Sequence, residues 1–200
     1  MSLHHHSFKT LLKVTAITVA LAACGGTGKV QPETEEPPAR ASEEQVRMET
    51  DFMIGKAAYT TGDLQRAEAI FYAMSRAYPE LAAPQINLTM VYARQGDVKK
   101  AERAFRKALS LKSDISELYN HMGIMYREKG EFAKAILQYK KGLEIDPNHT
   151  SLLANIGILY DLYMDQPQEA LKYYQRYQAL VPDDNQVKSW IAALKQRTVK

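Results

Sequence analysis

The feature that most constrains the fold of this chain is a spacing of 34 residues at which the same residue types return. Landmarks of the segment 116–149 recur one spacing earlier, with Tyr92 for Tyr126, Gly96 for Gly130, Ala101 for Ala135 and Phe105 for Tyr139. A second step back reaches Gly62, Ala67 and Phe71. Small and aromatic residues in fixed positions at this spacing are typical of a helix-turn-helix unit that stacks into a solenoid. We therefore predict an all-α solenoid that serves as a binding scaffold.

In register, four copies of the unit cover residues 48–81, 82–115, 116–149 and 150–183. Each copy carries a small residue where its first helix crosses its second, an alanine on the second helix, and an aromatic residue expected to fill the space between successive helix pairs. In chain order these are Gly55, Thr89, Gly123 and Gly157, then Ala67, Ala101, Ala135 and Ala170, then Phe71, Phe105, Tyr139 and Tyr174. A small residue facing a large one lets the helices approach closely.

The sequence also predicts where the turns lie. Gly62, Gly96 and Gly130 suit the left-handed residue that ends a helix, and Pro79, Pro147 and Pro182 stop the second helices, whereas Ser113 stands in the proline position of copy two. In copy four the landmarks after the turn lie one residue later than in the other copies, and we expect this extra residue in the turn, where Asp165-Gln166-Pro167 replaces Gly-Asp. Residues 184–198 then read as a capping helix, with Asp183 or Asp184 at its start and an apolar stripe of Val187, Trp190, Ile191 and Leu194.

Residues 1–23 have the anatomy of a signal peptide. Lys9 and Lys13 precede an uncharged run, Val14–Ala23, that is shorter than the roughly 20 residues a membrane-spanning helix needs. The tetrapeptide at 21–24, Leu-Ala-Ala-Cys, resembles the bacterial lipobox, which implies a lipid on Cys24; the alternative is a chance cysteine in an ordinary secretory signal. Residues 24–47 are then a lipidated cysteine and a flexible tether, and His4–His6 is assigned no function.

The order small–aromatic–Gly–Ala–aromatic–Pro over residues 48–183 resembles the tetratricopeptide repeat. Departures are Ser113, and Met74 and Tyr177 where a small residue is usual. The resemblance implies a right-handed superhelical solenoid of about four repeats. Together with the lipobox, it resembles the small tetratricopeptide lipoproteins of pilus biogenesis and secretion in the bacterial cell envelope. By resemblance to sorted lipoproteins, Gly25 after the cysteine implies the periplasmic face of the outer membrane.

The family's geometry implies a partner-binding groove on the first helices. Its residues in this chain are Phe52, Lys56, Tyr59, Ile86, Met90, Asn120, Ile124, Arg127, Ile158 and Asp161. Such a surface suits an amphipathic helix or an extended peptide. The alternative is that these side chains fill gaps between the first helices or are covered by the tether. For the family's carboxylate clamp, Lys56 and Asn87 match, but Glu117 and His121 stand where bases are required.

Catalytic and metal motifs are missing from the sequence after residue 23. It has two histidines, His121 and His149, and neither lies in a HExxH motif or a paired-carboxylate frame. His121 occupies the position of Asn87 and Asn155 in neighbouring copies, which predicts hydrogen bonds between repeats, and we expect His149 to be solvated. We also expect the charged run at residues 99–103 to be a solvated face. No cofactor is predicted.

Charge argues against a nucleic-acid partner. The net charge is +3, and removing the segment with Lys9 and Lys13 leaves 3 − 2 = +1. We interpret the chain as a non-enzymatic adaptor that binds a protein partner and assists assembly of an envelope machine such as a pilus or secretion system. Alternatives are an adaptor for peptidoglycan hydrolases or envelope proteases and, from another class, an enzyme. The sequence leaves the client and the oligomeric state open.

Overall fold

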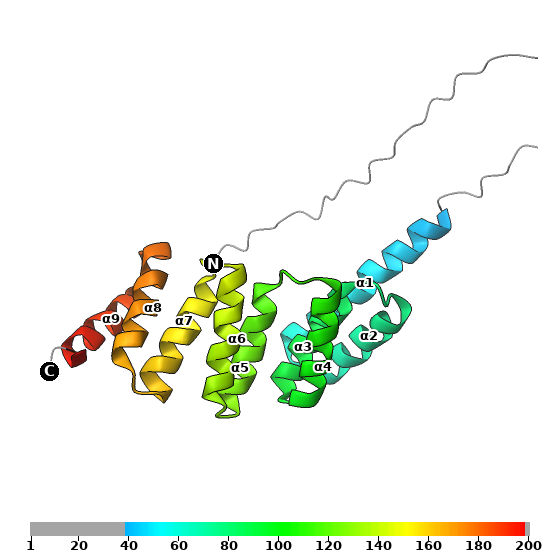
Figure 1. The fold of residues 1–200 in the computed structure, drawn as a ribbon. Coiled ribbons are helices and arrows are strands. Elements are labelled where there is room, and N and C mark those ends of the chain that lie inside the picture. The colour runs from blue at the N-terminus through cyan, green and yellow to red at the C-terminus, as the bar shows by residue number, and fades with distance from the viewer. Residues whose placement is uncertain (1–38, 199–200) are drawn as a thin grey trace, which may run out of the picture. The chain divides into compact units, whose positions relative to one another are not determined.

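The computed structural model describes residues 39–198 and is helical throughout this range apart from short connections (Figure 1). The elements are α1 Ala39–Thr61, α2 Leu64–Ala77, α3 Ala82–Gln95, α4 Val98–Leu111, α5 Ser116–Glu128, α6 Phe132–Ile145, α7 Thr150–Ile158, the π-helix η1 Leu159–Tyr163, α8 Pro167–Leu180 and α9 Asn185–Thr198. Consecutive helices pair as α1 with α2, α3 with α4, α5 with α6, and α7 with α8. The predicted all-α solenoid is confirmed, and α3, α5 and α7 begin at the first residues of copies two, three and four.

Helix α1 begins at Ala39 rather than near Met48, so residues 39–47 are helical where the sequence predicted tether. This segment, ARASEEQVR, is rich in good helix formers, and it extends a helix that residues 48–61 already nucleate. From Glu43 to Arg47 its side chains are exposed. The predicted lipidation site Cys24, the tether up to residue 38 and His4–His6 lie outside the described residues.

The glycines of the helix crossings receive aromatic rings of their own helix pair. A Cβ atom at Gly123 would overlap the ring of Tyr139, and one at Gly157 would overlap Tyr174. Both rings are buried. The sequence placed these aromatics between successive pairs; they lie within a pair instead, because the missing glycine side chain leaves a ring-sized space there.

Copy two lacks this arrangement. Thr89 occupies the glycine position, is fully buried, and donates its hydroxyl to the Gln85 carbonyl oxygen at 2.8 Å. The aromatic residue of this copy, Phe105, is only half-buried and packs edge-on against Tyr119 of α5, with ring centroids 5.1 Å apart. In copy two, therefore, a threonine occupies the glycine position and the aromatic ring lies against the next helix pair rather than inside its own.

The turns inside the pairs use left-handed residues. Gly62, Gly96 and Gly130 have φ angles of 87°, 71° and 74°, as their positions predicted, and Asp165 adopts the same conformation with φ 49° in copy four. The extra residue of copy four does not lie in this turn. It is absorbed one turn earlier by the π-helix η1, because a π-helical turn holds one residue more than an α-helical turn.

The connections that follow the second helices, three between copies and one to α9, fall into two kinds. In three of them a backbone N–H closes a turn onto the carbonyl three residues earlier, from Leu81 to Tyr78, from His149 to Asp146 and from Asp184 to Val181. In the connection Lys112–Ile115, which contains Ser113, no such bond forms within the described chain. The stacking changes at the same place: α3 packs on α2 and α7 packs on α6, whereas the backbone of α5 lies closer to α3 than to α4 of the preceding pair. Helix α4 meets α5 chiefly through side chains, with Phe105 against Tyr119 and Glu102 bonded to Tyr126. The loop between α4 and α5 stands out in Figure 1.

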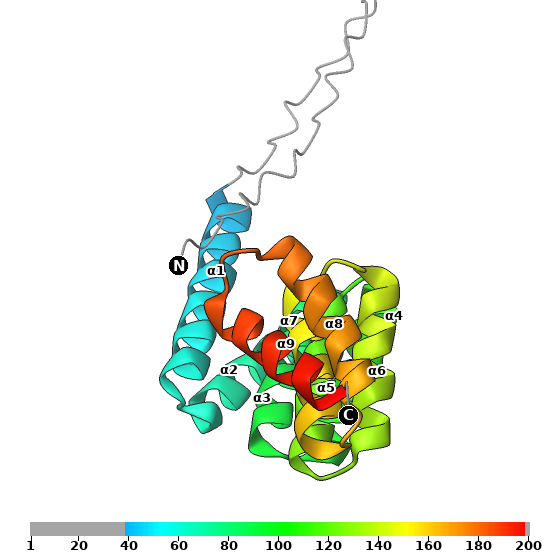
Figure 2. The ribbon, with the colours of Figure 1, turned by 90° about the vertical axis from the view of Figure 1, so that its left-hand side faces the viewer.

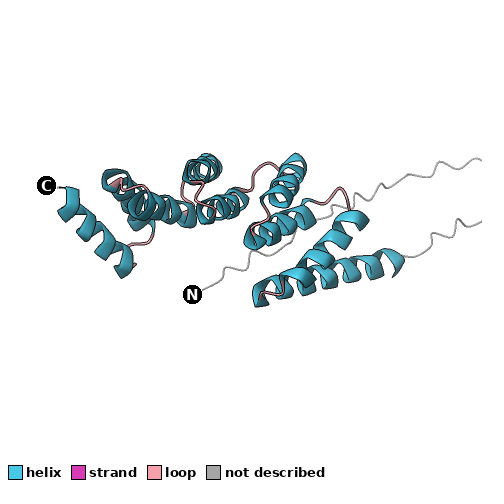
Figure 3. Cartoon of the chain, turned by 90° about the horizontal axis from the view of Figure 1, so that it is seen from below, coloured by secondary structure: helices cyan, strands magenta, loops and turns pink. Residues whose placement is uncertain are grey.

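Helix α9 closes the C-terminal end by packing on α8 (Figures 1 and 2). Asp184 caps it, accepting from the N–H groups of Gln186 and Val187 at 3.0 and 3.1 Å. On the stripe predicted for this helix, the ring of Trp190 packs against Tyr174 at a tilt of 40°, with centroids 5.3 Å apart. The view from below in Figure 3 shows the helices joined by short loops. No helix within residues 39–198 is long and apolar enough to cross a membrane.

Candidate functional site

The residues predicted to bind a partner lie on the first helices of the pairs, and we call them the first-helix face. They are Phe52, Lys56 and Tyr59 on α1, Ile86 and Met90 on α3, Asn120, Ile124 and Arg127 on α5, Ile158 on α7 and Asp161 on η1. Asn120 is buried, Lys56 is exposed, and the others are half-buried. The structure thus spreads them along the array, but several are engaged by neighbouring copies.

At the N-terminal end, Tyr59 is held by Arg94 of α3. The Arg94 guanidinium lies 5.2 Å from the Tyr59 ring centroid and its Nη1 donates to the Tyr59 carbonyl oxygen at 2.7 Å. Burial raises the pKa of Tyr59, against the opposing effect of Arg94. Lys56 lies over the ring of Phe52 at 5.7 Å, and Phe52 meets Phe71 edge-on. This end therefore offers an exposed ammonium group above a packed aromatic pair.

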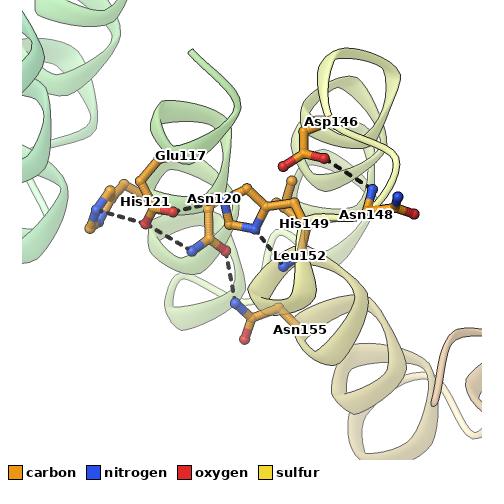
Figure 4. A network of polar contacts seen from close by, with 8 residues as sticks. All are labelled: Glu117, Asn120, His121, Asp146, Asn148, His149, Leu152 and Asn155. Atoms are coloured by element: carbon orange, nitrogen blue, oxygen red, sulfur yellow. Dashed lines mark hydrogen bonds and ion pairs between the residues drawn. The ribbon is translucent and has the colours of Figure 1, made fainter. Parts of the chain in front are cut away.

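In the middle of the array, Asn120 and Arg127 both bind Asn155 of the next copy (Figure 4 shows the asparagine pair). Asn155 Nδ2 donates to Asn120 Oδ1 at 2.8 Å, and Arg127 Nη1 donates to Asn155 Oδ1 at 3.3 Å. Asn120 Nδ2 donates in turn to Glu117 Oε1 at 3.2 Å. These groups join copies three and four, and the Asn120 amide is not presented to solvent.

Glu117 stands between both histidines of this region, as Figure 4 shows. His149 Nε2 lies 2.9 Å from Glu117 Oε2, and His121 Nε2 lies 3.3 Å from Glu117 Oε1. Burial lowers the pKa of His121, although the Glu117 carboxylate acts in the opposite direction. No group of three acidic, histidine or cysteine side chains within residues 39–198 is arranged to hold a metal ion.

Two histidine predictions are corrected here. His149 was expected to be solvated, but its side chain is 14% exposed because it caps α7, where Nδ1 accepts from the Leu152 N–H at 3.4 Å. His121 was expected to bond between repeats, yet it bonds within its own helix, as does Asn87 in the same position of copy two. Of the three residues in this position, Asn155 is the one whose side chain links two copies within the described chain.

At the C-terminal end, Asp161 is paired with α9. Arg197 Nη1 lies 2.7 Å from Asp161 Oδ1, and Arg197 Nη2 lies 3.1 Å from Asp165 Oδ1. One guanidinium thus ties the capping helix to the π-helix and to the turn that follows it.

The apolar members of the first-helix face differ in their packing. Ile124 and Ile158 are half-buried and pack against the hydrophobic core. Ile86 and Met90 are also half-buried, but they are not part of the core packing of residues 39–198. The pair on α3 is therefore the part of this face whose apolar surface the fold uses least.

Comparison with known proteins agrees with the helical repeat fold. Models of the tetratricopeptide repeat match residues 86–119 and 116–149. These residues contain two tetratricopeptide repeats. A comparison with curated protein sequences gave no match.

Solved structures of tetratricopeptide-repeat fold resemble the chain at low identity. PilF of Pseudomonas aeruginosa is 21% identical, with a TM-score of 0.64 over 76% of this chain and 69% of PilF. TTC0263, a tetratricopeptide protein of Thermus thermophilus, is 19% identical, with a TM-score of 0.63 over 79% and 87%. MamA is 19% identical, with a TM-score of 0.61 over 74% and 81%. These likenesses show the fold, and repeats of this kind generally mediate protein–protein interaction.

A pocket that the sequence did not predict lies between α2 and α4, the second helices of the first two helix pairs. Arg103 and Lys107 of α4 line it opposite Tyr72 of α2. The sequence assigned residues 99–103, which include Arg103 but not Lys107, to a solvated face. One signal was visible: no acidic residue stands three or four positions from Arg103 or Lys107, so neither cation has a partner along its own helix.

Proposed function

We propose that the chain is a non-enzymatic adaptor that binds a protein partner on its first-helix face and assists the assembly of an envelope machine such as a pilus or secretion system. The observation that carries the proposal is the surface of α3: Ile86 and Met90 expose apolar area that the core does not use. Apolar side chains in such positions are the usual anchors of a bound helix or peptide. Lys56 adds an exposed cation on the neighbouring first helix.

The proposal includes a lipid anchor on Cys24 that holds the protein at the periplasmic face of the outer membrane. Its support is the tetrapeptide at 21–24 together with Gly25. Acyl chains contribute about 0.8 kcal/mol per buried methylene, so several chains would keep the protein on the membrane. Labelled palmitate should appear on the wild type and not on Cys24→Ala, which should leave the membrane fraction or accumulate as precursor. An unlabelled wild type in the soluble periplasm would contradict the anchor.

The envelope machine is proposed from a combination of features. A lipobox followed by tetratricopeptide repeats resembles the small lipoproteins of pilus biogenesis and secretion, and the fold likeness to PilF supports the same assignment.

Co-purification from detergent-solubilised envelopes tests the adaptor function. The full chain, Met90→Glu and Lys140→Glu should be compared, with bound proteins identified by mass spectrometry. Lys140 is exposed on the second helix α6, so its change to glutamate also introduces a carboxylate but away from the first-helix face. We expect pilus or secretion subunits with the wild type and Lys140→Glu. We expect a loss of about 2 kcal/mol of affinity with Met90→Glu.

Ile124→Glu provides a second probe in the middle of the face, but it must be accompanied by a melting curve because Ile124 also packs against the core. If Met90→Glu and Ile124→Glu retain the partner and Lys140→Glu loses it, the binding site lies on the second helices instead. Recovery of wall hydrolases instead of pilus or secretion subunits would favour the peptidoglycan adaptor.

A further inference from the structure

The second helices carry a pocket of about 600 Å³ between α2 and α4, with α3 at its base. Its lining is Glu68, Tyr72 and Ser75 from α2, Gln85, Leu88 and Tyr92 from α3, and Lys100, Arg103, Ala104 and Lys107 from α4. This volume lies within the range of about 300–1,000 Å³ typical of ligand pockets in proteins. The pocket can therefore take one or two residues of an extended peptide.

The cations of the pocket are not equivalent. Lys100 is already neutralised, because its Nζ lies 3.1 Å from Glu68 Oε1 and over the ring of Tyr92 at 5.1 Å. Burial opposes ionisation of Glu68, but hydrogen bonds from Gln95 and Lys100 lower its pKa overall, so this carboxylate stays charged. At this end of the pocket the charges of Lys100 and Glu68 therefore compensate each other.

Arg103 and Lys107 lie one helical turn apart and pair with no carboxylate within residues 39–198. Both side chains are exposed at the pocket, which gives its other end an uncompensated positive charge. An arginine can bind a carboxylate through two parallel N–H donors, and a lysine adds a point charge beside it. This end is complementary to one or two carboxylates.

The remaining lining is apolar and aromatic. Leu88 and Ala104 are buried in the floor, and Tyr72 stands at the rim with 54% of its surface exposed. An exposed tyrosine beside an apolar floor suits an apolar or aromatic side chain with a polar backbone. Gln85 also lines the pocket, and its side-chain amide can bond to a peptide backbone.

We propose that this pocket binds an acidic peptide segment of a protein partner, with carboxylates on Arg103 and Lys107 and an adjacent apolar side chain between Tyr72 and Leu88. The mixed lining favours a peptide over an anionic lipid headgroup, because a headgroup would leave the apolar floor and Tyr72 without a partner. The pocket lies chiefly on the second helices, whereas the first-helix face lies on the first helices. Variants can therefore abolish binding at one surface and leave binding at the other intact.

Fluorescence anisotropy of the full chain with a labelled peptide Gly-Ser-Glu-Glu-Phe-Gly tests the proposal. Its counterpart with two glutamines in place of the glutamates should bind at least about tenfold more weakly, since charge-assisted hydrogen bonds are lost. The double variant Arg103→Glu/Lys107→Glu should weaken binding of the glutamate peptide by at least about tenfold. Added salt should weaken it as well, because the pocket is open to solvent.

A matched control is Lys99→Glu/Lys112→Glu. Both residues are exposed cations at the ends of α4 and neither lines the pocket, so the change of net charge is the same. We expect this control to bind like the wild type. Should the pocket variant melt early, Arg103→Gln/Lys107→Gln provides the same test without repulsion.

Equal binding of the two peptides, or equal losses in the pocket and control variants, would overturn the proposal. Vesicles containing phosphatidylglycerol form a separate arm. Binding to the vesicles that depends on Arg103 and Lys107, with none to the peptide, would also overturn it and assign the site to a lipid headgroup.

Discussion

Copies two and three of the repeat, residues 82–115 and 116–149, share one spacing but are packed differently. Copy three has Gly123 under a buried Tyr139 ring and ends in the Pro147 turn. Copy two has Thr89 in place of the glycine, and its Phe105 ring packs against the next helix pair. Its connection at Ser113 is open, in the sense that no backbone hydrogen bond closes it within the described residues. The stacking of the helices differs as well. Helix α7 packs mainly on the preceding second helix α6, whereas the backbone of α5 lies closer to the preceding first helix α3.

The contacts across the two joints differ as well. Between copies three and four, Asn155 binds both Asn120 and Arg127, and Arg176 donates to the Pro147 carbonyl oxygen. Between copies two and three, the Tyr126 hydroxyl donates to Glu102 at 2.5 Å. Stability in a repeat array therefore depends on which side chains occupy the shared positions of each copy, since each copy is stabilised chiefly by its neighbours.

The largest effect is expected at the helix crossing of copy three. Gly123→Leu places carbon atoms where the Tyr139 ring lies, so we expect a loss of about 3 kcal/mol in the free energy of unfolding. Thr89→Val in the same position of copy two removes a hydroxyl without adding bulk and should cost about 1 kcal/mol. Urea unfolding curves of both variants measure the difference. A smaller loss for Gly123→Leu than for Thr89→Val would show that the crossing is not the tight point.

The next effect concerns the joint between copies three and four. Asn155→Leu leaves the buried Asn120 oxygen without its donor and removes the acceptor of Arg127, which should cost about 2 kcal/mol. Tyr126→Phe breaks the bond to Glu102 across the other joint and should cost about 1 kcal/mol. Thermal melting of the two variants ranks the joints. The opposite ranking would mean that the asparagine network contributes little.

A gain is expected when copy two receives the proline of its neighbours. Lys112 already has the extended backbone, φ −152° and ψ 117°, that a residue before proline adopts, and the Ser113 N–H donates no backbone bond within the described residues. Ser113→Pro should therefore stabilise the protein by about 0.4–1 kcal/mol, mainly by restricting the unfolded chain. The reverse change, Pro147→Ser, is the control and should destabilise. Destabilisation by Ser113→Pro would show that the open connection is required by the stacking of α5 on α3.

The smallest effect is a pH dependence at His121. Its pKa is lowered in the folded protein, so the unfolded chain binds a proton more readily, and stability falls as the pH drops below the ordinary histidine pKa of about 6.5. The Glu117 carboxylate on the same helix limits the shift, and His149 faces Glu117 from the start of α7. His121→Asn, with the residue of the neighbouring copies, should flatten the fall of melting temperature between about pH 7 and 5. An unchanged pH profile would contradict this, and His121→Gln should behave like the asparagine variant.

Much of the fold follows from residues that every copy needs. The spacing placed the starts of α3, α5 and α7 at Ala82, Ser116 and Thr150, because glycine turns and proline stops act locally. The π-helix could not be assigned in this way. An added residue can be absorbed in a turn or in a helix, and the choice depends on what packs around it, here the clamp of Arg197 on Asp161 and Asp165.

The candidate site was less accessible to sequence reasoning. The frame identified which residues lie on the first helices, but the contacts of Asn120 with Asn155 and of Tyr59 with Arg94 depend on the distance between copies. The pocket between α2 and α4 arises from two helices that are adjacent only in space. Ser113 was visible as a departure, yet its coincidence with the changed stacking of α5 is a property of the assembled array.

The four copies share one spacing but are joined unequally, because no backbone hydrogen bond closes the connection at Ser113 within the described residues. Amide hydrogen exchange by NMR tests it at four equivalent positions. The N–H groups of Leu81, His149 and Asp184 close their turns, whereas that of Ile115 has no backbone acceptor within the described chain. We expect the Ile115 amide to exchange fastest of the four, and Ser113→Pro to slow it toward the others. Equal protection of all four amides in the wild type would contradict the claim.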